Sequence, residues 1–94
     1  MKKETTKKIT NATAHAREKH PDFAVNIHHA MCLAQEELGE VAKAINDMRD
    51  WQDIEDEIYD TIAVLVRMAE KDHLKMGASF QKCAWRVSFK DAGK

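Results

Sequence analysis

The sequence predicts an all-α protein, and three features support this. Apolar residues recur every three or four positions over long segments, as in amphipathic helices; the clearest run is Met31, Ala34, Leu38, Val41, Ile45 and Met48. Three glycines and one proline offer few β-turns. The 94 residues, 44% of them apolar, suit one small domain. We expect a single domain over residues 1–94, a helical hairpin that forms the core of a bundle of three to four helices completed by oligomerisation.

The composition excludes several classes of protein. The apolar share and a formal net charge of −1 are unlike those of a disordered chain. No run approaches the roughly 20 apolar residues of a membrane helix, and the basic start leads into no apolar block of a secretory signal. Cys32 and Cys83 lie far apart without a C-x-x-C motif, which indicates reduced thiols. We expect a cytoplasmic protein with no membrane partner.

Charge is segregated along the chain. Residues 1–20 and 71–94 each carry six basic and two acidic residues, whereas residues 35–60 carry ten acidic and two basic ones. Proteins that bind nucleic acid concentrate basic charge on one element, so this pattern does not predict a nucleic-acid partner. It raises the question of what neutralises the acidic centre.

The first predicted helix begins at a cap from Thr5 or Thr6 and runs to about His20, because Pro21 disfavours a helical residue before it. The second begins between Asp22 and Asn26 and ends near residues 49–50. Gly39, inside this second helix, predicts the close approach of a neighbouring helix or a ligand.

The third predicted helix follows at once, with Asp50 or Asp53 as its N-cap, and ends around residues 72–73. The short connection makes the second and third helices an antiparallel hairpin. A short fourth helix is predicted within residues 78–90. The apolar line of the third helix consists of Ile54, Ile58, Ile62, Leu65 and Ala69, and that of the fourth of Phe80, Cys83, Ala84 and Val87.

Two pairs of acidic residues border the apolar lines of this hairpin. Glu37 and Glu40 lie one turn apart on the second helix, and Glu57 and Asp60 lie one turn apart on the third. Packed hairpin helices bring the pairs together, where repulsion requires raised pKa values or bound cations. Oxygen ligands select hard ions, so we expect Mg²⁺, with Mn²⁺ as a substitute. A single such pair is more often a solvated helix surface.

The segment Glu36-Glu37-Leu38-Gly39-Glu40, followed after 16 residues by Glu57-Ile58-Tyr59-Asp60, resembles the EExxE…ExxD signature of MazG-type nucleotide pyrophosphohydrolases. The resemblance covers roughly residues 20–70. It implies an all-α homodimer or homotetramer that hydrolyses a nucleoside triphosphate, NTP or dNTP, to the monophosphate and pyrophosphate with Mg²⁺. The resemblance makes Glu37, Glu40, Glu57 and Asp60 the metal ligands.

Further roles follow from the chemistry of that reaction. Glu36 or Glu37 would accept the proton of the attacking water. Relatives grip the phosphates with basic residues after the third helix, and Lys75, Lys82 and Arg86 are the candidates here. Trp51 could stack on the base, although a tryptophan that closes the end of a core is more common.

Three other functions compete with this one. A phosphoribosyl-ATP pyrophosphatase is a related helical hydrolase. A di-iron bundle needs two Glu-x-x-His pairs, and the chain has one, at Glu70 and His73. The non-enzymatic alternative is a helical module for self-association or for binding a partner helix.

Overall fold

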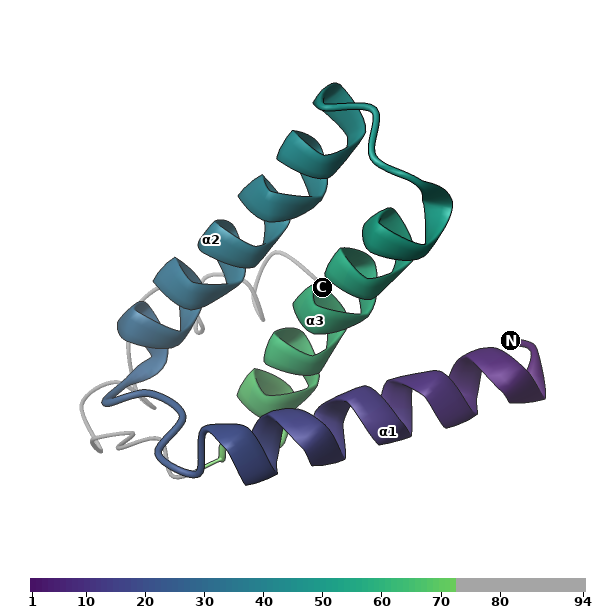
Figure 1. Ribbon diagram of the computed structural model, residues 1–94. Coiled ribbons are helices and arrows are strands. Elements are labelled where there is room, and N and C mark those ends of the chain that lie inside the picture. The colour runs from purple at the N-terminus through teal and green to yellow at the C-terminus, as the bar shows by residue number, and fades with distance from the viewer. Residues whose placement is uncertain (73–94) are drawn as a thin grey trace, which may run out of the picture.

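The computed structural model describes residues 1–72, which form three helices and no strand. These are α1 (Lys3–Lys19), α2 (Ile27–Asn46) and α3 (Trp51–Ala69). The helices α2 and α3 form the predicted antiparallel hairpin, and α1 lies beside α3 at an angle to it (Figure 1). The all-α fold class is confirmed, while the fourth helix predicted within residues 78–90 lies outside the described residues.

Side-chain caps set the start of α2 and α3 but not that of α1. Asn26 caps α2 by accepting a hydrogen bond from the backbone N–H of His29, within the predicted range. Asp50 caps α3 in the same way, as predicted. The predicted cap of α1 is wrong, because the helix begins at Lys3 and the Thr6 hydroxyl donates to the Lys2 carbonyl from within the helix. It ends at Lys19, just before Pro21, as expected.

The turn between α2 and α3 shortens α2 relative to the prediction. Met48 has a left-handed backbone, with φ of 55°. Its N–H donates to the Ile45 carbonyl, and the N–H of Arg49 donates to the Ala44 carbonyl. This is a Schellman motif, which satisfies the last free carbonyls of a helix. The helix therefore ends at Asn46, and the Met48 side chain is 88% exposed instead of extending the apolar line.

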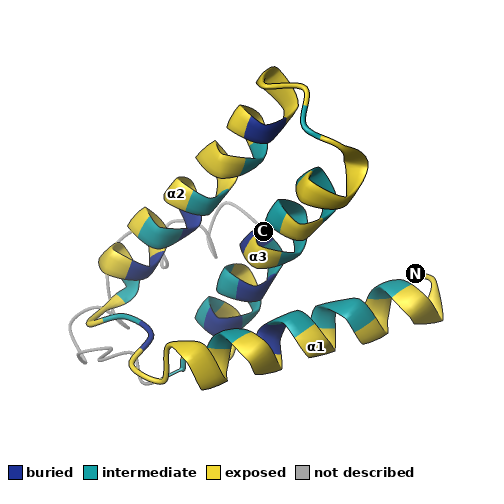
Figure 2. Ribbon diagram, in the orientation of Figure 1, coloured by how far each residue is buried: buried dark blue, intermediate teal, exposed yellow. Residues whose placement is uncertain are grey.

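Small residues form most of the buried core. The buried apolar residues of the described part are Phe23, Ala30, Ala34, Ala44 and Ala63. Four of these are alanines, which lets the backbones of α2 and α3 approach closely. The buried positions lie where the helices face one another (Figure 2).

The predicted apolar lines coincide only partly with these buried faces. On α2, Ala34 is buried, but Met31, Leu38 and Ile45 are between 46% and 60% exposed. They recur every seven residues and so form one stripe, about 80° around the helix from the side that faces α3. On α3, Leu65 is likewise exposed. Periodicity identified the helices correctly but selected a neighbouring face as the core. Among residues 1–72, no helix has both the length and the apolar composition required to cross a bilayer.

Arg67 joins the end of α3 to α1. It is 2% exposed, and it donates hydrogen bonds to the Asp72 carboxylate at 2.9 Å and to the Ala16 carbonyl at 3.1 Å. Its guanidinium stacks over the ring of Phe23, 4.6 Å from the centroid. Arg17 also binds Asp72 and, being the closer hydrogen-bond donor, holds the pKa of that carboxyl below its usual value. These contacts hold the C-terminal half of α1 against the end of α3.

Within residues 1–72 no neighbouring helix comes close to Gly39, so that half of the expectation is wrong, whereas the approach of a ligand stays a prediction. An added Cβ would meet nothing within 4 Å, because Gly39 lies on the exposed side of α2. We therefore expect Gly39→Ala to stabilise the protein by about 1 kcal/mol, since alanine is the better helix former. Urea unfolding measures this, with Ala42→Gly as the reverse control on the same exposed helix surface. A destabilised Gly39→Ala variant would contradict this reading.

Candidate metal centre

Three of the four predicted metal ligands converge between α2 and α3. Each of Glu37, Glu57 and Asp60 places a carboxylate oxygen within 4.8 Å of the other two. Glu37 and Glu57 are half-buried, and Asp60 is more exposed. Ala34 and Ala44 on α2 and Thr61 on α3 are buried nearby, so small side chains permit the close helix packing that brings the acids together. The antiparallel hairpin was predicted to bring the acidic residues of its two helices together, and these three carboxylates do lie together.

The fourth predicted ligand, Glu40, lies outside this group of three but remains near it. It is exposed, and its charge contributes to the raised pKa values of Glu37 and Glu57. Glu36 is also exposed and makes a smaller contribution to the pKa of Glu37. Both therefore lie at the solvent side of the cluster, whereas Glu37 lies inside it.

Electrostatics make this cluster costly without a cation. Partial burial, followed by repulsion from Asp60 and Glu57, raises the pKa of Glu37 above its usual value. Burial and the charges of Asp60 and Glu40 raise the pKa of Glu57 as well. Burial and Asp56 raise the pKa of Asp60, while Lys19 and His15 act in the opposite direction. Within residues 1–72, none of the three carboxylates forms an ion pair.

A pocket of about 370 Å³ opens beside the carboxylates, between α1 and the hairpin. Glu37 and Asp60 form one side. Phe23, Leu33 and Val64 give it apolar lining. The remaining lining residues are Ala12, His15, Ala16, Lys19, His20, Asp22, Ala63 and Arg67.

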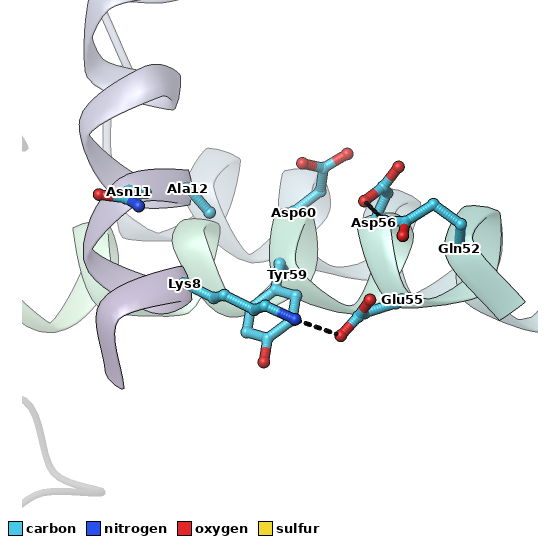
Figure 3. Close-up of a pocket in the computed structure, with 8 residues that line it drawn as sticks. All are labelled: Lys8, Asn11, Ala12, Gln52, Glu55, Asp56, Tyr59 and Asp60. Carbon is cyan, nitrogen blue, oxygen red and sulfur yellow. Dashed lines mark hydrogen bonds and ion pairs between the residues drawn. The ribbon is translucent and has the colours of Figure 1, made fainter. Parts of the chain in front are cut away.

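A second, more open groove continues past Asp60 along α1 and α3, with a volume of about 520 Å³. On one side of it, the Lys8 ammonium binds the Glu55 carboxylate at 3.0 Å and lies over the ring of Tyr59 (Figure 3). The carboxylates of Asp56 and Asp60 lie away from this ion pair, on the other side of the groove (Figure 3). Asp60 thus lines both the groove and the pocket.

Among residues 1–72, the other predicted site residue, Trp51, is not part of this cluster. Trp51 is 66% exposed at the first position of α3 and lines neither pocket. It lies about 13 Å from Asp60 along the helix axis. Lys75, Lys82 and Arg86 lie outside the described residues.

The contribution of α1 to the pocket was not predicted from the sequence. His15, Lys19 and Phe23 line the pocket, although no ligand motif contains them. A signal was present, because His15 and Lys19 are four positions apart and share a helix face with the small residues Ala12 and Ala16. It could not reveal which element that face would meet.

Comparison with protein-family models, with curated proteins and with solved structures found no match for this chain.

The raised carboxylate pKa values make stability fall as pH rises in the absence of cations. The folded state holds its protons more tightly than the unfolded state, so the free energy of unfolding declines from about pH 4.5 upward through the raised values of Glu37 and Glu57. Asp72, with a lowered pKa, contributes the opposite trend only at lower pH. We expect Glu37→Gln to flatten the decline. Urea unfolding at about pH 5 and about pH 7.5 measures the free energy of unfolding of the wild type, of Glu37→Gln and of the exposed control Asp47→Asn. An equal fall in the free energy of unfolding between the two pH values in the wild type and Glu37→Gln would contradict the prediction.

Proposed function

We propose that the protein hydrolyses a nucleoside triphosphate, NTP or dNTP, to the monophosphate and pyrophosphate with the help of Mg²⁺. The observation that carries this proposal is the convergence of Glu37, Glu57 and Asp60 beside a pocket of about 370 Å³. Ligand pockets commonly have about this volume or more. The EExxE…ExxD pattern supplies the sequence-level support.

The donor set suits a hard divalent cation. All three groups are carboxylates, with neither sulfur nor imidazole in the group, and this favours Mg²⁺ or Mn²⁺. Their raised pKa values have the same origin as their affinity for a cation, namely negative charges close together and partly removed from water. Glu37, Glu57 and Asp60 would hold the ion, with Glu40 at the solvent side as a further ligand. The bound ion would polarise the phosphoryl oxygens and neutralise the charge of the leaving pyrophosphate.

The chain itself supplies a proton acceptor for the attacking water. Glu37 and Glu36 are the two candidates, and Glu37 is the better placed because it lines the pocket and belongs to the group of three carboxylates, whereas Glu36 does neither. The rates of pyrophosphate release of Glu36→Gln and Glu37→Gln show which of the two carboxylates the reaction needs.

Pyrophosphate release tests the proposal. The purified protein is incubated with each common NTP and dNTP and with phosphoribosyl-ATP, in Mg²⁺, in Mn²⁺ and in EDTA. We expect release of pyrophosphate from at least one nucleoside triphosphate with Mg²⁺ or Mn²⁺ and none with EDTA. Turnover of phosphoribosyl-ATP alone would favour the related hydrolase. The absence of release from every substrate would overturn the enzymatic proposal.

The exposed apolar stripe on α2 supports assembly into a homodimer or homotetramer. Met31, Leu38 and Ile45 form this stripe, and Leu65 on α3 is also exposed. Exposed apolar side chains repeated along one side of a helix are typical of an interaction site. The same stripe favours the second candidate function, a module for self-association without catalysis. Light scattering of the wild type and of Leu38→Lys tests assembly, with Cys32→Lys as a control at an exposed position about 120° around the same helix. An unchanged mass of Leu38→Lys would contradict this interface.

A further inference from the structure

We propose that α1 provides the phosphate-binding side of this site, with Lys19 and His15 contacting the phosphates of the nucleotide and the apolar lining receiving its nucleoside. This inference rests on the proposed function for the identity of the ligand. It assigns to α1 a role that the sequence analysis gave to Lys75, Lys82 and Arg86.

The placement of the two residues carries the first step. His15 and Lys19 are one turn apart on α1, and both line the pocket whose opposite side holds Glu37 and Asp60. Lys19 first, and His15 after it, lower the pKa of Asp60 against the effect of its burial, so both lie close enough to act on that carboxylate. A phosphate group between α1 and a carboxylate-bound cation would contact positive charge on both sides.

The other basic residues of α1 carry the second step. Lys8 is paired with Glu55, and Arg17 is paired with Asp72 and Glu70, so both join α1 to α3. Within residues 1–72, Lys19 forms no ion pair and His15 no hydrogen bond, although both face the pocket. Lys8 and Arg17 thus join α1 to α3, Lys3 and Lys7 are exposed away from both pockets, and Lys19 is the lysine of α1 that faces the pocket without an ion pair in the described part of the chain.

The apolar lining carries the third step. Phe23 is 7% exposed, and its ring is held by the stacked guanidinium of Arg67. Leu33 and Val64 complete an apolar region next to the charged residues. An apolar region with a few charged groups at one side is the usual form of a small-ligand pocket. A nucleoside phosphate has the matching division, with an aromatic base at one end and anionic oxygens at the other.

Substitution on α1 tests the inference. Lys19→Met and His15→Gln remove the proposed contacts, and Lys7→Met, on the same helix but lining neither pocket, is the matched control. Three quantities are measured: KM and kcat for the nucleotide that the wild type hydrolyses fastest, the affinity for inorganic tripolyphosphate with Mg²⁺, and the affinity for Mn²⁺ alone. We expect Lys19→Met to raise KM and weaken tripolyphosphate binding by about tenfold or more, as for the loss of a charge-assisted hydrogen bond.

The other two readouts separate the possible failures. Mn²⁺ affinity is expected to stay equal or to increase in Lys19→Met, because a positive charge near Asp60 is lost. Unchanged KM and tripolyphosphate affinity would overturn the inference and leave Lys19 as a neutralising neighbour of Asp60, with the proposed function intact. If the wild type hydrolyses no nucleotide but binds tripolyphosphate in a Lys19-dependent manner, the proposed function fails and the phosphate-binding role of α1 stands.

Discussion

Asp60→Asn is expected to reduce Mg²⁺-dependent pyrophosphate release by at least about a hundredfold while leaving the fold intact. The substitution keeps the shape of the side chain but removes one of the three negative charges that converge between α2 and α3. A neutral amide binds Mg²⁺ more weakly than a carboxylate does. Glu57→Gln is expected to have an effect of the same order, and the assay is the rate of pyrophosphate release at saturating nucleotide over a range of Mg²⁺ concentrations.

Stability distinguishes loss of the site from loss of the fold. Without cations, Glu57→Gln is expected to be at least as stable as the wild type, because burial and repulsion raise the pKa of Glu57 and the neutral residue removes that cost. Mg²⁺ should raise the melting temperature of the wild type and not that of the variant. Asp47→Asn, an exposed acid in the same acidic segment, is the control and should retain activity. If Asp60→Asn retained the wild-type rate, the carboxylate cluster would not be the site of hydrolysis.

Arg67→Met is expected to destabilise the protein by about 3 kcal/mol, since it removes a hydrogen bond to a mostly buried carboxylate. The change leaves Asp72, which is mostly buried, with Arg17 as its remaining partner. It also removes the hydrogen bond to the Ala16 carbonyl and the cation–π contact with Phe23. Small domains have about 5–15 kcal/mol of total stability, so a loss of this size is a large fraction of it. Urea unfolding followed by circular dichroism measures the difference.

Two further variants isolate the cause. Arg17→Met breaks a pair with the same Asp72, but its side chain is 42% exposed, so a much smaller effect is expected. Arg67→Lys keeps the charge but loses the planar guanidinium, and it should recover only part of the lost stability. If Arg67→Met cost no more than Arg17→Met, the junction between α1 and the end of α3 would depend on other contacts.

The hairpin and its acids could be predicted from the sequence because both depend on local spacing. Residues three or four apart share a helix face, and the short connection at residues 47–50 leaves an antiparallel arrangement as the simple solution. Asn26 and Asp50 also cap where local chemistry indicates. From these facts alone, Glu37, Glu57 and Asp60 are expected to converge, as they do.

The choice of the buried face could not be predicted in the same way. Leu38 and Ile45 are the more hydrophobic residues of α2, yet Ala30, Ala34 and Ala44 are the buried ones. Close packing of two helices depends on the side-chain volumes of both partners at the contact, and the periodicity of one helix does not contain that information. The end of α2 was misplaced for a related reason, because Met48 adopts a left-handed conformation that usually belongs to glycine or asparagine.

Helix type, hairpin topology and the chemistry of the carboxylates are therefore properties of the chain read over short distances, where spacing and residue type are sufficient. The pocket is different, since it exists only because Arg67 and its neighbours hold α1 against the hairpin. Contacts between segments about 50 residues apart place His15 and Lys19 opposite Glu37 and Asp60. Such contacts depend on the packing of all three helices together. The stabilisation that α1 gains by packing depends on which apolar surface of the hairpin α2 and α3 have left exposed to water.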